Sequence, residues 1–246
     1  DASLNFAYGA GTNFNTSWDF GAKYRIANPV SLVQYPALAT AVHHKHFDEG
    51  APAAARRLTL DQAFAGYDAL NQPFDGVWEG AETLTIPPEV FALGRISNKV
   101  GDDVTPSERS DWDTGWDRLE ETVTANTGQL FWNYGEKYFE ARSAKTQGVV
   151  GFAEGKTLTL PDVTIAMESE YASLLVTALD NRPLNESGRV LVTAVAREKW
   201  TGAVIERTGA MTAEMRALGG PPLMMEPVQA TLSFNTPFET PKALDH

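Results

Sequence analysis

The sequence predicts a mainly β protein, an antiparallel and jelly-roll-like β-sandwich that follows a short β-α remnant and a linker helix. Short apolar, β-branched and aromatic runs recur along most of the chain, with Gly, Pro, Asn and Asp between them. Two of these runs alternate in polarity around a tight turn, and two others are apolar on both faces. A chain of 246 residues is long enough to bury a sizeable core.

The alternating runs Gln129–Tyr134 and Lys137–Arg142 predict a β-hairpin. Between them, Gly135 opens a two-residue connection, which suits a hairpin turn with a positive φ at its first central position. Trp132 and Tyr134 share one face of the first strand. We interpret both as core residues, although an exposed pair would form a carbohydrate-binding ridge.

The remaining strand candidates recur at similar spacing and are separated by turn residues. The runs Leu174–Val176 and Val190–Val195 predict central strands, because they are apolar on both faces. The segment Glu206–Leu218 is compatible with a short helix or a loop. The other candidate strands are Thr83–Ile86, Val90–Ile96, Gly148–Phe152, Thr157–Leu160, Val163–Met167, Ala172–Leu179, Arg189–Ala196, Ala203–Ile205 and Val228–Phe234.

The first 46 residues have a different character, with the run Leu4–Tyr8 predicting a strand. Asn28 and Pro29 then predict a helix start, because Asn caps helices and Pro suits the first helical position. Pro36 is expected to kink or divide this helix. Its apolar stripe is predicted from Leu32, Tyr35, Leu38, Ala39 and Val42.

Three domains are therefore expected. Residues 1–46 would form a terminal β-α unit, and residues 47–73 a linker with one short helix. A capping box at Thr59–Gln62 marks the start of that helix. Residues 74–246 would form the β-sandwich domain.

Composition excludes several function classes. A net charge of −12 argues against nucleic acid and against anionic membrane surfaces as partners. Cysteine is absent, so disulfides and thiolate metal sites are excluded. No signal peptide and no apolar run of membrane-spanning length is visible in the sequence. We expect no cofactor, and we expect the chain to be a piece of a longer protein.

Several segments in order along the chain resemble bacterial secreted multidomain glycoside hydrolases. The first of them, Asp19–Ala37, looks like the end of a (β/α)8 catalytic barrel, and the later ones look like strands of the sandwich behind it. The sandwich segments are Asn126–Phe152, Arg189–Arg197 with Thr201-Gly202, Pro222–Val228 and Ala243–His246.

The resemblance implies a secreted or periplasmic location and a polysaccharide or oligosaccharide ligand. It also implies an upstream barrel of the same parent protein as a partner, with the catalytic carboxylates in that barrel. The leading hypothesis is therefore a non-catalytic accessory module that supports the barrel and binds carbohydrate. The alternatives are part of a working hydrolase completed by another segment, and an autonomous carbohydrate-binding module.

Trp18 and Asp19 are the first candidate ligand contacts. They lie in the loop after the first predicted strand, which faces the active site in a (β/α)8 barrel. Trp18 offers an aromatic plane to a sugar ring, and Asp19 offers acceptors for its hydroxyl groups. The alternative is that Trp18 packs the loop against its own domain.

The segment Asp111–Asp117 is the second candidate. Its alternating acids and Gly resemble part of a calcium loop, yet the third early acid and the distal Glu of an EF-hand are missing. Trp112 and Trp116 would instead form a sugar platform, or anchor a solvated acidic loop. No metal is expected here.

Two further groups of residues are weaker candidates for a functional site. His43, His44 and His46 can in principle bind zinc, but adjacent histidines diverge on a helix, so a surface helix end is preferred.

The carboxylates of Glu168, Glu170 and Glu226 lie nearest to apolar strands. A glycosidase needs two such groups across a cleft, and no spacing in the sequence brings a pair together.

Overall fold

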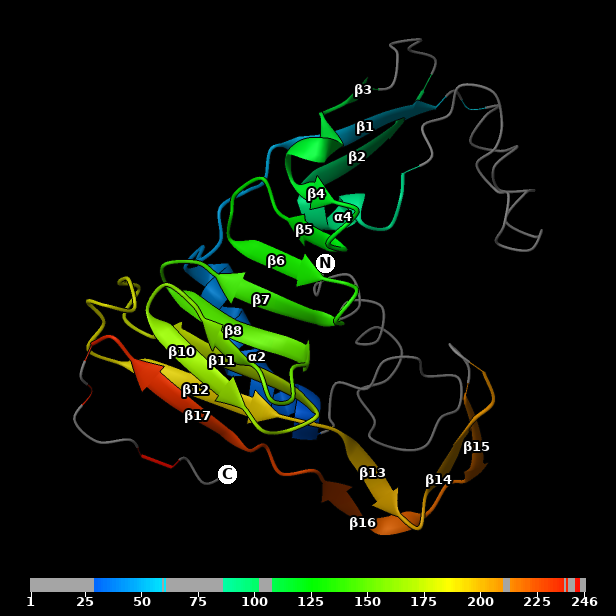
Figure 1. Ribbon diagram of the computed structural model, residues 1–246, viewed down its shortest axis with the longest axis vertical. Coiled ribbons are helices and arrows are strands. Elements are labelled where there is room, and N and C mark those ends of the chain that lie inside the picture. Colours follow the sequence, from blue (N-terminus) through cyan, green and yellow to red (C-terminus); the bar gives the residue numbers. More distant parts are fainter. Residues whose placement is uncertain are drawn as a thin grey trace. The chain divides into compact units, whose positions relative to one another are not determined.

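The computed structural model describes residues 29–58, 60, 86–101, 108–209, 213–236, 238 and 242–243. These residues confirm the predicted fold class, because they form mainly antiparallel β-structure with few helices (Figure 1). The predicted residues Trp18, Asp19 and Leu4–Tyr8 lie outside the described part, as does most of the linker helix predicted after Thr59.

The chain divides into two compact units. One contains Asp1–His46 together with Ala144–His246, and the other contains Phe47–Ser143. The division after His46 falls where a domain boundary is predicted. Residues 144–246, however, group with the N-terminal segment and not with residues 74–143, because their strands carry the α-helix of that segment on one face.

In the first unit, two antiparallel sheets form the sandwich. In one sheet, β11 (Tyr171–Ala178) pairs with β8 (Thr146–Phe152) on one side and with β12 (Val190–Val195) on the other. The other sheet has the order β17–β10–β9, with β9 at Thr157–Thr159. Its remaining strands are β10 (Val163–Met167) and β17 (Ala230–Phe234).

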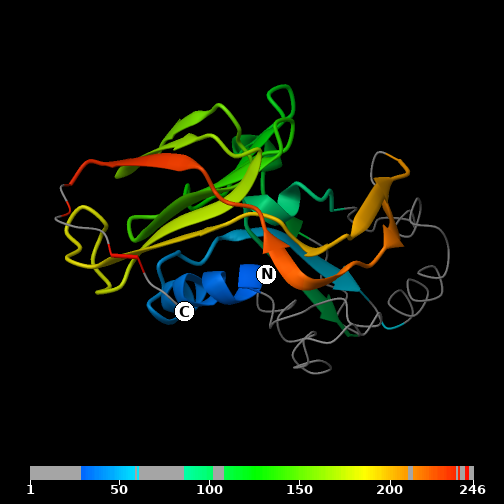
Figure 2. The same cartoon turned by 90° about the horizontal axis from the view of Figure 1, so that it is seen from below.

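The helix α2 (Pro29–His43) covers the first of these sheets on the side opposite β17 (Figures 1 and 2). Strand β11 is buried almost throughout, because it is covered on both faces. Ser173 on the helix side donates from Oγ to Oε1 of Gln34 at 3.0 Å. Leu174 and Val176, on the other side, pack with Val149 in the core. The antiparallel sandwich is thus confirmed, and the strand orders do not establish a jelly roll.

The contact face of α2 differs from the predicted stripe. Ala37 and Ala41 are buried, whereas Leu32 and Val42 are 50% and 75% exposed. The alanines lie four residues apart, so they share one face of the helix. Their small side chains allow close packing on the sheet, which larger residues would prevent. Helix α2 is continuous through Pro36, so the predicted division of the helix does not occur.

A two-part β-ribbon leaves the sandwich between β12 and β17 (Figure 1). Its inner part pairs β13 (Glu198–Thr201) with β16 (Gly220–Met225). Its outer part pairs β14 (Val204–Arg207) with β15 (Ala213–Ala217). Glu206–Leu218, predicted as helix or loop, therefore contains a strand.

The second unit combines a small sheet with a four-strand antiparallel ladder. β1 (Pro52–Leu58) is flanked by the parallel β2 (Arg95–Val100) and the antiparallel β3 (Glu108–Arg109). The ladder has the order β7–β6–β5–β4. Its strands are β4 (Trp116–Asp117), β5 (Thr122–Thr124), β6 (Leu130–Asn133) and β7 (Tyr138–Arg142).

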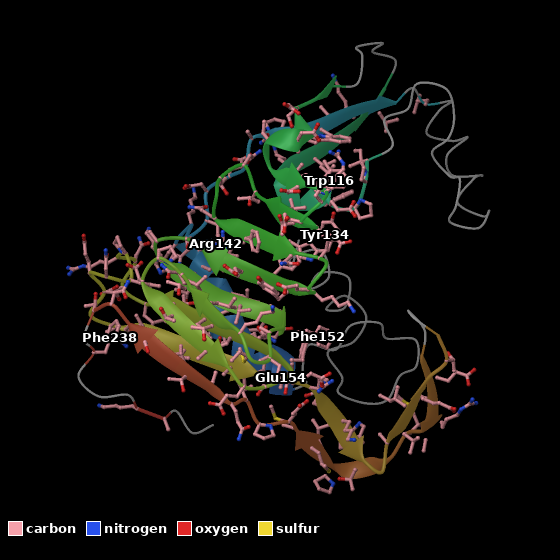
Figure 3. All side chains as sticks on the ribbon, viewed as in Figure 1. Trp116, Tyr134, Arg142, Phe152, Glu154 and Phe238 are labelled. Atoms are coloured by element: carbon pink, nitrogen blue, oxygen red, sulfur yellow. The ribbon has the colours of Figure 1, made fainter. Side chains whose placement is uncertain are left out.

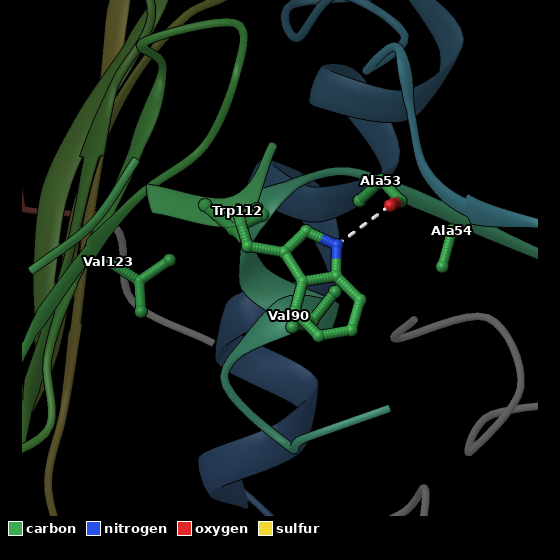
Figure 4. Close-up of a cluster of buried hydrophobic side chains, with 6 residues drawn as sticks. Ala53, Ala54, Val90, Trp112 and Val123 are labelled. Carbon is green, nitrogen blue, oxygen red and sulfur yellow. Dashed lines mark hydrogen bonds between the residues drawn. The ribbon is translucent and has the colours of Figure 1, made fainter. Parts of the chain in front are cut away.

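A hydrophobic cluster holds this unit together (Figure 4). It receives residues from β1, from the one-turn helix α4 (Val90–Leu93), from the 3-10 helix η1 (Trp112–Thr114) and from β5. The buried members are Ala53, Ala54, Val90, Leu93, Trp112 and Val123. Trp132 and Tyr134 are partly buried and pack against it, in agreement with their interpretation as core residues.

Three predictions in this unit are wrong. Residues 47–73 are more than a linker with a helix, because β1 lies within them, pairs with β2 and β3, and buries Ala53 and Ala54 in the cluster. Val90–Ile96 is not one strand, because α4 buries Val90 and Leu93 at helical spacing and β2 begins only after Gly94. The turn of the β6–β7 hairpin has four residues rather than two, and its positive φ of 67° belongs to Lys137. Gly135 does not have a positive φ, and a side chain there would meet the flexible side chain of Glu121, which would have to shift.

The prediction that Val190–Val195 is a central strand is also wrong. Among the described strands, β12 pairs with β11 alone. Thr193 and Val195 are buried, while Val192 is 43% exposed. Strand β12 lies at the edge of its sheet, but helix α2 covers one of its faces. Because of this cover, the sequence of β12 resembles that of a central strand.

Candidate functional site

The first unit contains a shallow pocket of about 350 Å³. Four parts of the chain contribute to it: the first turn of α2, the end of β8, the start of β11, and the junction between β12 and β13. The lining residues are Val30, Phe152, Tyr171, Ala196, Arg197 and Glu198. This volume lies near the lower end of the range of small-molecule sites.

Phe152 and Tyr171 form the aromatic wall of the pocket. They are directly opposite each other in the β8–β11 ladder, so their side chains emerge on the same face of the sheet. Their ring centroids are 5.2 Å apart at an interplanar angle of 62°. Phe152 is 42% exposed at the end of β8 (Figure 3), which leaves ring surface available to a ligand.

Arg197 forms the charged side of the pocket together with two carboxylates. Its Nε donates to Oε2 of Glu226 at 2.8 Å, and its Nη2 donates to Oε1 of the same residue at 3.2 Å. Nη2 also donates to Oε2 of Glu170 at 2.6 Å. A guanidinium suits this arrangement because its N–H groups lie in one plane and can serve two carboxylates at once.

The hydrogen bonds between Arg197 and the two glutamates favour the charged forms of Arg197 and Glu226. Hydrogen bonding to Arg197 lowers the pKa of Glu226. Hydrogen bonding to Glu226 and then to Glu170 raises the pKa of Arg197. The structure thus brings together two of the three carboxylates considered from the sequence. Glu226 is held ionised by Arg197, whereas a glycosidase acid needs a raised pKa.

Glu198 links the pocket to α2. Its Oε2 accepts a hydrogen bond from the backbone N–H of Val30 at 3.3 Å, which satisfies one of the free donors at the helix start. A carboxylate is favourable at this end of a helix because it faces the positive end of the helix dipole. The contact therefore holds Val30 against the junction that follows β12.

Trp112 is not a sugar platform in this structure. It is only 8% exposed, and its Nε1 donates to the carbonyl oxygen of Ala53 at 2.9 Å (Figure 4). The sequence placed it in an acidic loop, but Asp111 caps η1 and turns the indole inward. The acidic neighbours are on the surface, and the aromatic residue between them is in the core.

Trp116 is partly buried, and the contacts on its ring are internal. Its Nε1 donates to the hydroxyl oxygen of Tyr134 at 3.2 Å. The guanidinium of Arg118 lies 4.0 Å from its ring centroid, a cation–π contact that covers one face. Trp112 and Trp116 therefore do not form a joint flat surface.

The carboxylates of the acidic loop Asp111–Asp117 accept hydrogen bonds from nearby backbone N–H groups or pair with the neighbouring Arg118. Asp111 accepts from the backbone N–H of Asp113, which itself pairs with Arg118. Asp117 accepts from the N–H groups of Leu119 and Glu120. Across the described ranges, no group of three or more His, Asp or Glu residues is arranged to hold a metal ion.

The histidines separate into two environments. His43 and His44 are exposed, as the surface prediction requires. His46 is only 3% exposed, so for this residue the prediction is wrong. Its Nδ1 lies 2.8 Å from Oγ1 of Thr146, and its Nε2 is buried with no hydrogen-bond partner in the described structure. Burial, followed by the charges of Lys145 and His44, lowers its pKa.

Sequence reasoning missed Phe152, Tyr171 and Arg197 as candidate ligand contacts. The available signal was an aromatic residue at the end of one predicted strand, Gly148–Phe152, and another directly before a second, Ala172–Leu179. Their convergence depends on the register of β8 against β11, which strand patterns alone leave open.

The fold defines the class of this chain as a mainly β protein with an antiparallel sandwich. No family model, curated protein sequence or solved structure matches it. In the described part of the chain, no helix has the length and apolar character needed to span a membrane. The resemblance to glycoside hydrolases therefore stays a prediction.

Proposed function

We propose that this chain is a non-catalytic accessory module of a secreted glycoside hydrolase and that it binds carbohydrate at the pocket of the first unit. The observation that carries the proposal is the half-exposed Phe152–Tyr171 pair beside Arg197 and Glu198. An aromatic ring can cover the apolar C–H face of a pyranose, while charged groups nearby bind its hydroxyls.

A binding role fits this group better than hydrolysis. Glu170 and Glu226 converge on one guanidinium instead of facing each other across an open gap. Arg197 would have to leave before either carboxylate could donate a proton to a glycosidic oxygen. The pocket is shallow and open, which suits the side of a long polysaccharide chain.

Isothermal titration of the whole chain against a panel of soluble polysaccharides tests the proposal. Replacing Phe152 by Ala should weaken binding about two- to tenfold, because an aromatic contact is worth about 0.5–1.5 kcal/mol beyond its buried area. Phe91→Ala is the matched control, since Phe91 is also exposed but lies on α4 in the second unit. This control should bind as tightly as the unmodified chain.

Absence of binding to every polysaccharide by the folded chain would refute the carbohydrate-binding role. Equal affinities of the Phe152→Ala variant and the unmodified chain would move the ligand away from this pocket. Release of reducing ends by the chain on its own would contradict the non-catalytic part of the proposal. It would favour instead the alternative that the chain is part of a working hydrolase.

A further inference from the structure

We propose that the pocket prefers glycans that carry protonated amines and disfavours glycans that carry carboxylates or sulfates. This inference rests on the proposed carbohydrate-binding function and names the ligand class of the same site. It follows from how the charges around Arg197 are already paired.

Arg197 is the only cation in the pocket lining among the described residues, and two carboxylates already balance it. Three charge-assisted hydrogen bonds from Nε and Nη2 hold it in place. An anionic sugar would have to compete with Glu170 and Glu226 for this guanidinium. Such competition costs the hydrogen bonds that are broken, which are stronger than those between neutral groups.

The charges near the pocket sum to a negative value. The guanidinium of Arg197 is paired with the carboxylates of Glu170 and Glu226, and Glu198 in the pocket lining adds a third carboxylate. Lys199 is a second cation that acts on Glu226. Among the residues that the structure describes, these are two positive charges against three negative ones. The net charge of −12 on the whole chain has the same sign, so an approaching anion is repelled at longer range as well.

Glu198 is the residue best placed to receive an amine. It lines the pocket, and among the described residues its carboxylate accepts a hydrogen bond at Oε2 from the backbone of α2. An ionised carboxylate accepts several hydrogen bonds, so one contact leaves capacity for a ligand ammonium group. The pocket is open to water, and the resulting preference should therefore be modest and sensitive to salt.

Three tetrasaccharides of equal length provide the test, at about pH 6, where sugar amines carry charge and uronic acids are ionised. They are the tetramers of glucosamine, N-acetylglucosamine and galacturonic acid. At low salt, titration calorimetry should show the glucosamine tetramer binding about two- to fivefold more tightly than the N-acetylglucosamine tetramer. The galacturonate tetramer should bind most weakly, and salt should reduce both differences.

Glu198→Gln tests the assigned residue, because the amide keeps an acceptor for Val30 but loses the charge. It should abolish the preference for the amine. Glu186→Gln is the control, since Glu186 is exposed in the loop between β11 and β12 and should leave the preference intact.

The outcomes separate the two proposals. Equal binding of the amine and acetylated tetramers, or tighter binding of the galacturonate, would overturn the charge preference while leaving a carbohydrate-binding pocket. An unchanged preference in Glu198→Gln would also overturn the assignment to this site. No binding of any of the three tetramers would overturn the charge preference, and the polysaccharide panel would then decide whether the chain binds carbohydrate at all.

Discussion

The side chain of Gln147 joins the two sheets of the sandwich by pairing with Asp162. Its Nε2 donates to Oδ2 of Asp162 at 2.7 Å, and its Oε1 accepts from the backbone N–H of Asp162 at 2.9 Å. Gln147 lies on β8 and is fully buried, while Asp162 directly precedes β10. The amide thus satisfies its own polar atoms and fixes the start of a strand in the opposite sheet.

Replacing Gln147 by Leu should destabilise the chain by about 1–3 kcal/mol, because the carboxylate and the backbone N–H of Asp162 would each lose the hydrogen bond to Gln147. Urea unfolding followed by circular dichroism measures this difference. Gln229→Leu is the matched control, because the Gln229 side chain is exposed and only its backbone is bonded to Ser169. If both variants lost equal stability, the buried pair would not be the cause.

The buried Trp112 should be important for the stability of the second unit. Trp112→Ala removes a large side chain from the cluster and a hydrogen bond to Ala53, so we expect a loss of about 3–5 kcal/mol. Tryptophan fluorescence during urea unfolding would follow it. Leu119→Ala, at a residue that is 93% exposed, should have almost no effect. A similarly small effect for Trp112→Ala would contradict its placement in the core.

The stability of the first unit should fall below neutral pH because of His46. Its pKa in the folded chain is lowered by burial, so the unfolded chain binds the proton more tightly. The contribution is therefore fully present above about pH 6.5, the ordinary pKa of His, and is lost as the pH falls through the folded pKa.

Unfolding free energies measured at several pH values between about 5 and 7.5 test this dependence on His46. His46→Gln should flatten the pH dependence relative to the unmodified chain, because Gln keeps a polar contact for Thr146 without titrating. His43→Gln, at an exposed residue of the same helix end, should retain it. Identical slopes in all three proteins would reject the role of His46.

The hydrogen bonds from Arg197 to Glu226 predict how the pKa of Glu226 responds when the guanidinium is removed. In Arg197→Gln, the pKa of Glu226 should rise towards its ordinary value, because its principal hydrogen-bond donor loses its charge. NMR titration of the side-chain carboxyl carbons measures it directly. The overall stability should change little, since both ion pairs are substantially exposed. An unshifted Glu226 would show that Arg197 does not control it.

Strand positions in residues 129–195 were largely predictable. The strands β6 to β12 fall within or close to the predicted runs, because alternating burial leaves a period of two in the sequence. Val163–Met167 is the clearest case, with the predicted and observed bounds identical. The prediction of a helix start at Pro29 is likewise confirmed, since the ring of Pro fits the first helical position.

Predictions failed where packing overrides local pattern. Ala37 and Ala41 form the contact face of α2 although larger apolar residues lie elsewhere on the helix. The run after Pro88 is a helical turn because Val90 and Leu93 both reach the cluster of the second unit. Trp112 also reaches this cluster, which agrees with the alternative that it anchors the acidic loop and not with a sugar platform.

The sequence alone thus determined the β class, most strands of the sandwich and the start of α2, since each depends on a short-range periodicity or cap. The grouping of Asp1–His46 with Ala144–His246, the burial of His46 and the pocket all depend on tertiary contacts. The pocket requires Val30, Tyr171 and Arg197 to meet from distant parts of the chain. Strand register and helix docking bring such residues together, and neither leaves a local pattern in the sequence.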